Sequence, residues 1–153
     1  KQVEIDILGI GDKDSVLFAE CKKSAEIAER HSVTLCMECH NWTYTNTKDS
    51  ALELMGAVAS PAFCMYWQPN QFESESTNVE YARALSSYTE HIHVFNWNGN
   101  EKYSLIDAVD VWERYLCEFV GERALLLEFM PDNNINSLRA EADALRKIAG
   151  DKI

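Results

Sequence analysis

Two glutamates, a histidine and a glutamine occupy positions from which they could hold a metal ion. Glu38, Gln68, His93 and Glu128 each lie in or at the end of a short β-rich run. Carboxylate and amide oxygens with one imidazole nitrogen are donors that suit divalent cations such as Mn²⁺ or Mg²⁺. Where the runs are neighbouring strands, the four side chains converge on one point. We therefore predict a divalent metal site.

Side-chain alternation supports this interpretation. In the run 33–40, Glu38 and His40 share a face at the carboxyl end, where α/β folds place their active sites. Glu128 follows three leucines, and burying a carboxylate without a partner is costly. Taken singly, a strand-end histidine or glutamate is more often structural, but four polar ends in succession favour a functional site.

The elements that would position these residues alternate along the chain. β-rich runs are expected at 3–10, 33–40, 62–68, 91–97 and 124–130. Helical patterns are expected at about 15–30, from Thr47 to about 55, and at about 79–89, 105–119 and 137–149. Such alternation predicts βα units and a parallel sheet, since parallel strands need helix-length connections. The fold class is therefore α/β.

The five cysteines do not indicate a metal or redox centre. Cys36 and Cys39 form a CxxC string, but their odd offset places the two sulfurs on opposite faces of one strand. Zinc binding by this pair would need a bulge, and most of the cysteines lie in apolar segments. Buried, reduced thiols of a cytoplasmic protein are the simpler interpretation.

Composition narrows the class of partner. The chain has 153 residues, 46% of them hydrophobic and 25% charged, as in an ordinary globular domain. No apolar run approaches the roughly 18 residues of a membrane helix, and the start is unlike a signal peptide. We thus expect a cytoplasmic protein that does not bind membranes. The net charge of −11 repels phosphate backbones and disfavours nucleic acid.

The motifs resemble the xylose-isomerase-like superfamily of (β/α)8 TIM barrels. This superfamily includes sugar epimerases and isomerases, inosose dehydratase and the endonuclease IV group. Its Glu-x-His motif corresponds to Glu38-Cys39-His40, its strand-end histidine to His93 in HIHVFNW, and its last glutamate to Glu128 in LLLEF. Gln68 stands where the family has an aspartate ligand.

The resemblance implies a function and a role for each residue. Glu38, Gln68, His93 and Glu128 would bind the metal, which is Mn²⁺ by preference, with Mg²⁺, Co²⁺ or Zn²⁺ as alternatives. Glu38 and Glu128 would exchange a proton next to a carbonyl through an enediolate, as in a sugar isomerase or epimerase. The substrate contacts would come from His40, Asn70 and Trp97. Trp67 is adjacent to Gln68 in the strand and so points to the opposite face, where it would pack under helices.

Three alternatives to the isomerase remain. Gln68 removes one negative charge from the metal site, which weakens metal binding and motivates a non-catalytic sugar-binding barrel. A lyase that dehydrates a polyol ketone would use the same residues. An endonuclease is disfavoured by the acidic charge and by too few histidine and aspartate ligands. Only Lys102 is basic in the strand-end loops, which favours an unphosphorylated sugar or polyol as the substrate.

The length does not match a whole barrel. A TIM barrel needs about 250 residues and eight strands, whereas this sequence supplies five β-rich runs. We predict that residues 1–153 form a single incomplete TIM-barrel domain, its C-terminal βα units, with about three strands missing before Lys1. The exposed strand edges would otherwise pair with another chain, for instance in a homo-oligomer. We expect weak or no activity from this chain alone.

Overall fold

The computed structural model describes residues 13–150. The predicted strand at 3–10 lies outside the described residues, so the fifth strand stays a prediction. Among the described residues, no helix combines the length and apolar character that crossing a bilayer requires.

Helices and strands alternate as the sequence predicts. The helices are α1 (Lys13–Arg30), α2 (Lys48–Val58), α3 (Glu75–Leu85), α4 (Val109–Leu116) and α5 (Leu138–Ile148). The strands are β1 (Leu35–Glu38), β2 (Phe63–Trp67), β3 (Thr89–Val94), β4 (Trp97–Asn98), β5 (Glu101–Lys102) and β6 (Ala124–Leu127). Short 3₁₀ turns η1 (Tyr44–Asn46), η2 (Leu105–Ala108) and η3 (Ile135–Ser137) precede α2, α4 and α5.

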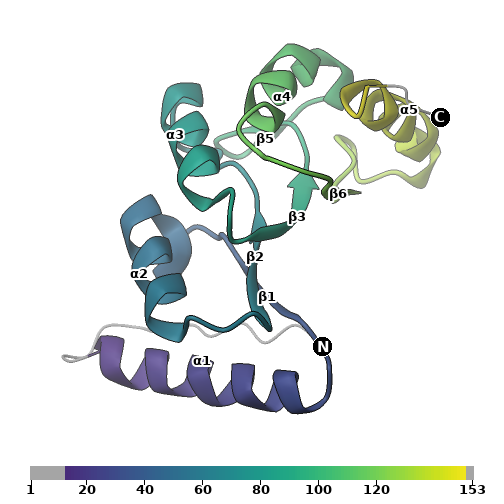
Figure 1. The fold of residues 1–153 in the computed structure, drawn as a ribbon. Helices are drawn as coiled ribbons and strands as arrows, with labels where there is room; N and C mark the ends of the chain where they lie inside the picture. Colours follow the sequence, from purple (N-terminus) through teal and green to yellow (C-terminus); the bar gives the residue numbers. More distant parts are fainter. Residues whose placement is uncertain (1–12, 151–153) are drawn as a thin grey trace.

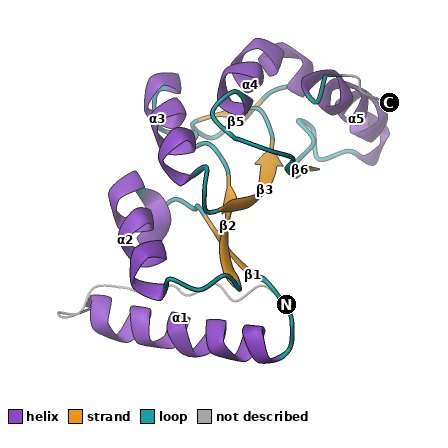
Figure 2. Cartoon of the chain, viewed as in Figure 1, coloured by secondary structure: helices purple, strands orange, loops and turns teal. Residues whose placement is uncertain are grey.

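The sheet is parallel and covered by helices. Its strand order is β1-β2-β3-β6, and every pairing in it is parallel. The helices follow one another in an arc outside the strands (Figures 1 and 2). The α/β prediction is confirmed, and β4 and β5 add a small antiparallel hairpin after β3.

The two faces of the sheet differ in burial. In β2, Phe63, Met65 and Trp67 are buried on the helix side, while Cys64 and Tyr66 are half-buried on the other face. Trp67 packs edge-on against Trp112, at a centroid distance of 6.2 Å. Its ring also contacts those of Tyr115 and Phe119. This confirms that Trp67 packs under helices. Burial of one such ring stabilises the fold by about 4–6 kcal/mol.

Element boundaries differ from the predictions where side chains supply local caps. Helix α3 begins at Glu75, ahead of the predicted 79, because the Ser74 hydroxyl accepts a hydrogen bond from the Thr77 amide at 3.1 Å. It ends at Leu85, and the predicted end at Thr89 is wrong because Thr89 opens β3. Thr47 caps α2 as predicted, accepting from the Ser50 amide at 3.3 Å.

All four predicted strands that lie in the described residues are shorter than expected, and two of them end before a predicted site residue. The run 91–97 ends as a strand at Val94, and Trp97 belongs to the β4–β5 hairpin. The run 124–130 ends at Leu127, so Glu128 is the first residue beyond β6. The predicted helix 105–119 consists of η2 and α4, which ends at Leu116.

A buried carboxylate fastens α5 to the start of η2. Glu141 is buried and accepts hydrogen bonds from the Ser104 hydroxyl at 2.7 Å and from the Leu105 amide at 2.8 Å. The sequence gives no sign of this contact, because the partners lie more than thirty residues apart. Glu141 thereby caps a turn whose amide would otherwise be buried without a partner.

We predict that Glu141→Ala lowers the free energy of unfolding by about 1–3 kcal/mol, because it leaves the Leu105 amide unsatisfied. Urea denaturation followed by circular dichroism measures this loss. Asp143→Ala on the same helix is the control, since Asp143 makes only an exposed contact with Arg146. Equal stability of Glu141→Ala and Asp143→Ala would contradict this role.

The cysteines are free thiols in very different surroundings. No disulfide links them, and Cys36 lies opposite Cys64 in the sheet register while Cys39 is buried in the core. Burial raises the pKa of the Cys39 thiol to about 12. The separate positions of Cys36 and Cys39 fit the prediction that this CxxC string does not chelate one ion.

We predict that iodoacetamide at pH 8 modifies the exposed Cys117 and leaves Cys39 intact, because alkylation requires an accessible thiolate. Peptide mass spectrometry after timed quenching measures both rates, and denatured protein shows the intrinsic reactivity of each thiol. Equal labelling of Cys39 and Cys117 in the folded protein would contradict the burial of Cys39.

Candidate metal and catalytic site

The parallel sheet brings the predicted ligands to one edge. Glu38 ends β1, Gln68 follows β2, His93 lies near the end of β3, and Glu128 follows β6. Because all strands run the same way, these ends meet at the edge where TIM barrels carry their active sites. The Glu128 amide donates to the Val94 carbonyl at 3.2 Å, which continues the β3–β6 ladder to the site.

Two carboxylate side chains and one imidazole converge there. The ligand atoms of Glu38, His93 and Glu128 lie within 4.8 Å of one another. His93 Nδ1 is 3.6 Å from Glu38 Oε1 and 3.6 Å from Glu128 Oε2. Gln68 joins them, since its Oε1 lies 3.0 Å from the same nitrogen. One imidazole nitrogen is thus surrounded by oxygens from three strand ends.

The surroundings alter the proton affinity of the site. Burial raises the pKa of Glu128, and the negative charge of Glu38 acts in the same direction. Burial disfavours the charged form of His93, but the carboxylates of Glu38 and Glu128 outweigh it and raise the pKa of His93. Two half-buried carboxylates beside one imidazole give the cluster more acidic than basic groups, an arrangement that favours a bound cation.

The residues present fit a divalent metal ion. Glu128 Oε2 is buried and has no hydrogen-bond partner, so a cation would satisfy it. Two carboxylates and an imidazole supply three protein ligands, and the Gln68 amide oxygen is placed to be a fourth. Binding through His93 Nδ1 would require this nitrogen to give up its proton and its bond to Gln68.

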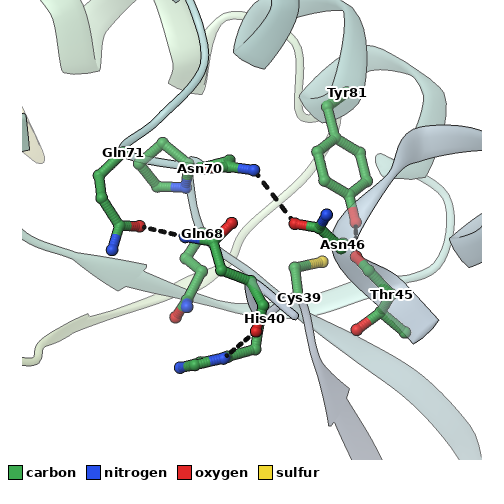
Figure 3. Close-up of a pocket in the computed structure, with 10 residues that line it drawn as sticks. Cys39, His40, Thr45, Asn46, Gln68, Asn70, Gln71 and Tyr81 are labelled. Carbon is green, nitrogen blue, oxygen red and sulfur yellow. Dashed lines mark hydrogen bonds between the residues drawn. The ribbon is translucent and has the colours of Figure 1, made fainter. Parts of the chain in front are cut away.

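Two predicted substrate contacts lie in the loops beside this cluster (Figure 3). The His40 side chain is exposed, and its Nδ1 lies 2.8 Å from the Asn41 carbonyl oxygen. The Asn70 side chain donates to Asn46 Oδ1 at 3.2 Å and accepts from the Phe72 amide at 2.9 Å. Asn70 therefore shapes the loops, and its predicted contact with substrate stays a prediction.

Trp97, the third predicted substrate contact, packs against the loop that follows Glu128. Its ring lies 4.6 Å from that of Phe129, and Lys102 Nζ lies 4.8 Å from the Trp97 ring centre. The Trp97 indole nitrogen is buried without a hydrogen-bond partner. The structure places Trp97 at the strand ends, and its contact with substrate remains a prediction.

Tyr66 is a site residue that the sequence interpretation did not single out. Its ring stacks on His93 at 4.8 Å and on His91 at 5.0 Å, on the face of the sheet that carries Glu38. The stack restricts the imidazole plane of His93. The alternation of side chains was the available signal, because Tyr66 and Gln68 share a face of the predicted strand 62–68.

Comparison with known proteins bears on the fold. No family model and no curated protein matches the chain. Among solved structures, the chain is similar to the probable 3-DHS dehydratase AsbF from Bacillus anthracis, with a TM-score of 0.66 and 16% identity. It is also similar to an L-ribulose 3-epimerase, with a TM-score of 0.60 and 16% identity.

Both structures are TIM barrels of the xylose-isomerase-like superfamily. The chain has the fold of part of such a barrel. The matches cover 88% and 93% of this chain but 56% and 48% of the two similar chains. The chain thus spans about half the length of the barrels it matches. This confirms the partial-barrel prediction for the fold, while the substrate of this protein is a separate question.

We predict that Gln68→Glu tightens Mn²⁺ binding by about tenfold or more, because it adds a negative charge beside the ligands without changing the side-chain length. The same change lowers the melting temperature in EDTA, since three carboxylates then repel one another. Isothermal titration and thermal melts measure the two effects. His93→Ala is the companion variant and should lose Mn²⁺ binding.

Unchanged Mn²⁺ affinity in Gln68→Glu would show that position 68 does not reach the ion. Unchanged affinity in His93→Ala would show that the metal site itself is wrongly assigned.

Proposed function

We propose that this protein contributes the catalytic centre of a metal-dependent sugar isomerase or epimerase. The observation that carries the proposal is the convergence of Glu38, His93 and Glu128, with ligand atoms within 4.8 Å of one another. Two carboxylates beside one cation site are the groups needed to remove and return a proton next to a carbonyl. The partial-barrel fold supports the proposal by placing this cluster at the strand ends.

Each group has a role in the proposed reaction. A divalent ion bound by Glu38, His93 and Glu128 would polarise the carbonyl of an open-chain sugar and stabilise the negative charge that develops. One glutamate, as carboxylate, takes the proton from the carbon next to the carbonyl. If the other glutamate, in its protonated form, donates its own proton to the opposite face of the same carbon, the product is the epimer. If a proton is instead delivered to the former carbonyl carbon, while the proton of the neighbouring hydroxyl passes to the former carbonyl oxygen, the product is the isomer.

Burial suits Glu128 to this exchange. Its pKa is raised by desolvation, so its conjugate acid is a weaker acid and its carboxylate a stronger base than an exposed glutamate. Tyr66 stacks on His93 and fixes the imidazole between the two carboxylates. The two glutamates thereby keep a defined geometry about the reacting carbon.

The loops support an unphosphorylated sugar or polyol as substrate. They carry amide side chains that recognise hydroxyl groups, among them Asn41, Asn70 and Gln71. Lys102 is already engaged, since its Nζ lies over the Trp97 and Phe129 rings and donates to Asn133 Oδ1 at 2.9 Å. A phosphate would find little free positive charge there.

Two other functions use the same residues. The structural likeness to AsbF favours a lyase, in which removal of the proton next to a carbonyl is followed by loss of a hydroxyl group as water. The neutral Gln68 favours a barrel that binds sugar without turning it over. Isotope exchange separates the non-catalytic barrel from both enzymes, because the isomerase and the lyase each labilise a C–H bond. Product analysis then separates the two enzymes, because only the lyase forms water and an unsaturated product.

We predict that Glu128→Gln lowers metal-dependent exchange of solvent deuterium into ketoses by at least about 100-fold, because the amide cannot accept the proton. Proton NMR in D₂O with Mn²⁺ removed before detection measures the exchange. Glu118→Gln, at a half-buried carboxylate outside the cluster that pairs with Arg83, is the matched control and keeps the starting rate.

A Glu128→Gln variant with the full exchange rate would contradict the assignment of this base. Exchange that survives exhaustive chelation would contradict the metal requirement. Sugar binding with no exchange in the unmodified protein would favour the non-catalytic barrel.

A further inference from the structure

Two aromatic side chains stand exposed where three strand-end loops meet. Trp42, after β1, has 78% of its surface exposed, and Phe72, after β2, has 48%. Their ring centres lie 5.8 Å apart and their planes are inclined at 51°. We call this pair the aromatic platform. Large exposed aromatic rings in contact with each other are uncommon on a surface without a binding role.

The backbone at Trp42 is unfavourable for its side chain. Trp42 has a φ of 62°, in the left-handed region that a bulky residue other than glycine avoids. Glycine would relieve this cost and would also remove an exposed hydrophobic surface. A residue that is unfavourable in conformation and in solvation, and that gains little packing, is the kind of outlier from which a functional role is inferred.

The loops beneath the platform are tied to one another. Asn41 donates to Gln71 Oε1 at 3.0 Å, which joins the neighbours of Trp42 and Phe72. The Gly99 amide donates to the Gln71 carbonyl at 2.9 Å and brings the β4–β5 hairpin against the same loop. A Cβ at Gly99 would lie 4.0 Å from the Phe72 ring. These contacts connect the loops that carry the two rings.

The platform lies close to the candidate metal site. Asn41 and Gln71 line a small pocket together with His40 and Gln68 (Figure 3), and Gln68 contacts His93. His40 follows Glu38 by two residues in the sequence. Trp42 is two residues beyond His40, a reach of about 7 Å at most along the backbone. The platform thus belongs to the loops that border the pocket containing Gln68.

We propose that Trp42 and Phe72 form a stacking subsite for a second ring of an extended carbohydrate, a disaccharide or glycoside. A sugar ring has an apolar face of C–H groups, which packs on an aromatic ring, and a rim of hydroxyl groups, which hydrogen-bonds to amides. Trp42 supplies the aromatic ring for the C–H face of the sugar. Asn41 and Gln71 supply the amides for its hydroxyl groups. The inference rests on the proposed function only in assigning the other end of the ligand to the metal centre.

Binding without metal tests the subsite separately from the chemistry. Saturation-transfer NMR and isothermal titration on EDTA-treated protein compare cellobiose, maltose, lactose and trehalose with glucose and galactose. We expect at least one disaccharide to bind about tenfold more tightly than its monosaccharides. Trp42→Ala should abolish this preference while leaving Mn²⁺ affinity unchanged.

Trp42→Gly separates a binding role from a structural one. It should lose the disaccharide preference yet melt at the same temperature as the unmodified protein or higher, because glycine accepts the left-handed backbone. Val120→Ala, at a side chain 82% exposed in the loop before β6, is the control and should retain the preference.

Three results would overturn the subsite. They are the absence of any disaccharide preference, a preference that survives Trp42→Ala, and a large loss of melting temperature in Trp42→Gly. Loss of deuterium exchange with the disaccharide preference intact would instead count against the proposed chemistry alone.

Discussion

The position of one imidazole nitrogen constrains the functional edge of this protein. His93 Nδ1 lies 3.6 Å from each of two carboxylate oxygens and 3.0 Å from an amide oxygen. Two half-buried carboxylates repel each other and lose hydration, so positive charge between them, or a proton on one of them, stabilises the pair. A proton on His93 meets part of that demand, and a divalent cation would meet it more fully. The cluster is therefore a site built for positive charge.

The parallel direction of the strands makes this cluster possible. β1, β2, β3 and β6 run the same way, so residues from distant parts of the chain end at one edge. The helix-side face of each strand is apolar and fastened by the core around Trp67, Ile92 and Trp112, which leaves the opposite face for polar groups. A shift of one residue in β1 would turn Glu38 into the core and destroy both the packing and the site.

The loops extend the site beyond the metal cluster. Amide side chains tie the segment after β1 to the segment after β2, and the β4–β5 hairpin contacts the segment after β2. These hydrogen bonds lie beside Trp42 and Phe72, and the amides that make them also line the pocket that contains Gln68. The proposed stacking subsite therefore adjoins the loops of the candidate site.

The sequence by itself determined the strand–helix alternation, the burial of Trp67 beneath helices and the placement of Glu38 and Glu128 at strand ends. These follow from local periodicity, because neighbouring side chains alternate between faces whatever lies elsewhere in the chain. It could not supply the Gln68–His93 contact, the stacking of Tyr66, the Glu141 cap or the left-handed backbone at Trp42. Each of these depends on which strands become neighbours and on how distant loops meet. Such contacts join residues far apart in sequence, so only the tertiary structure decided them.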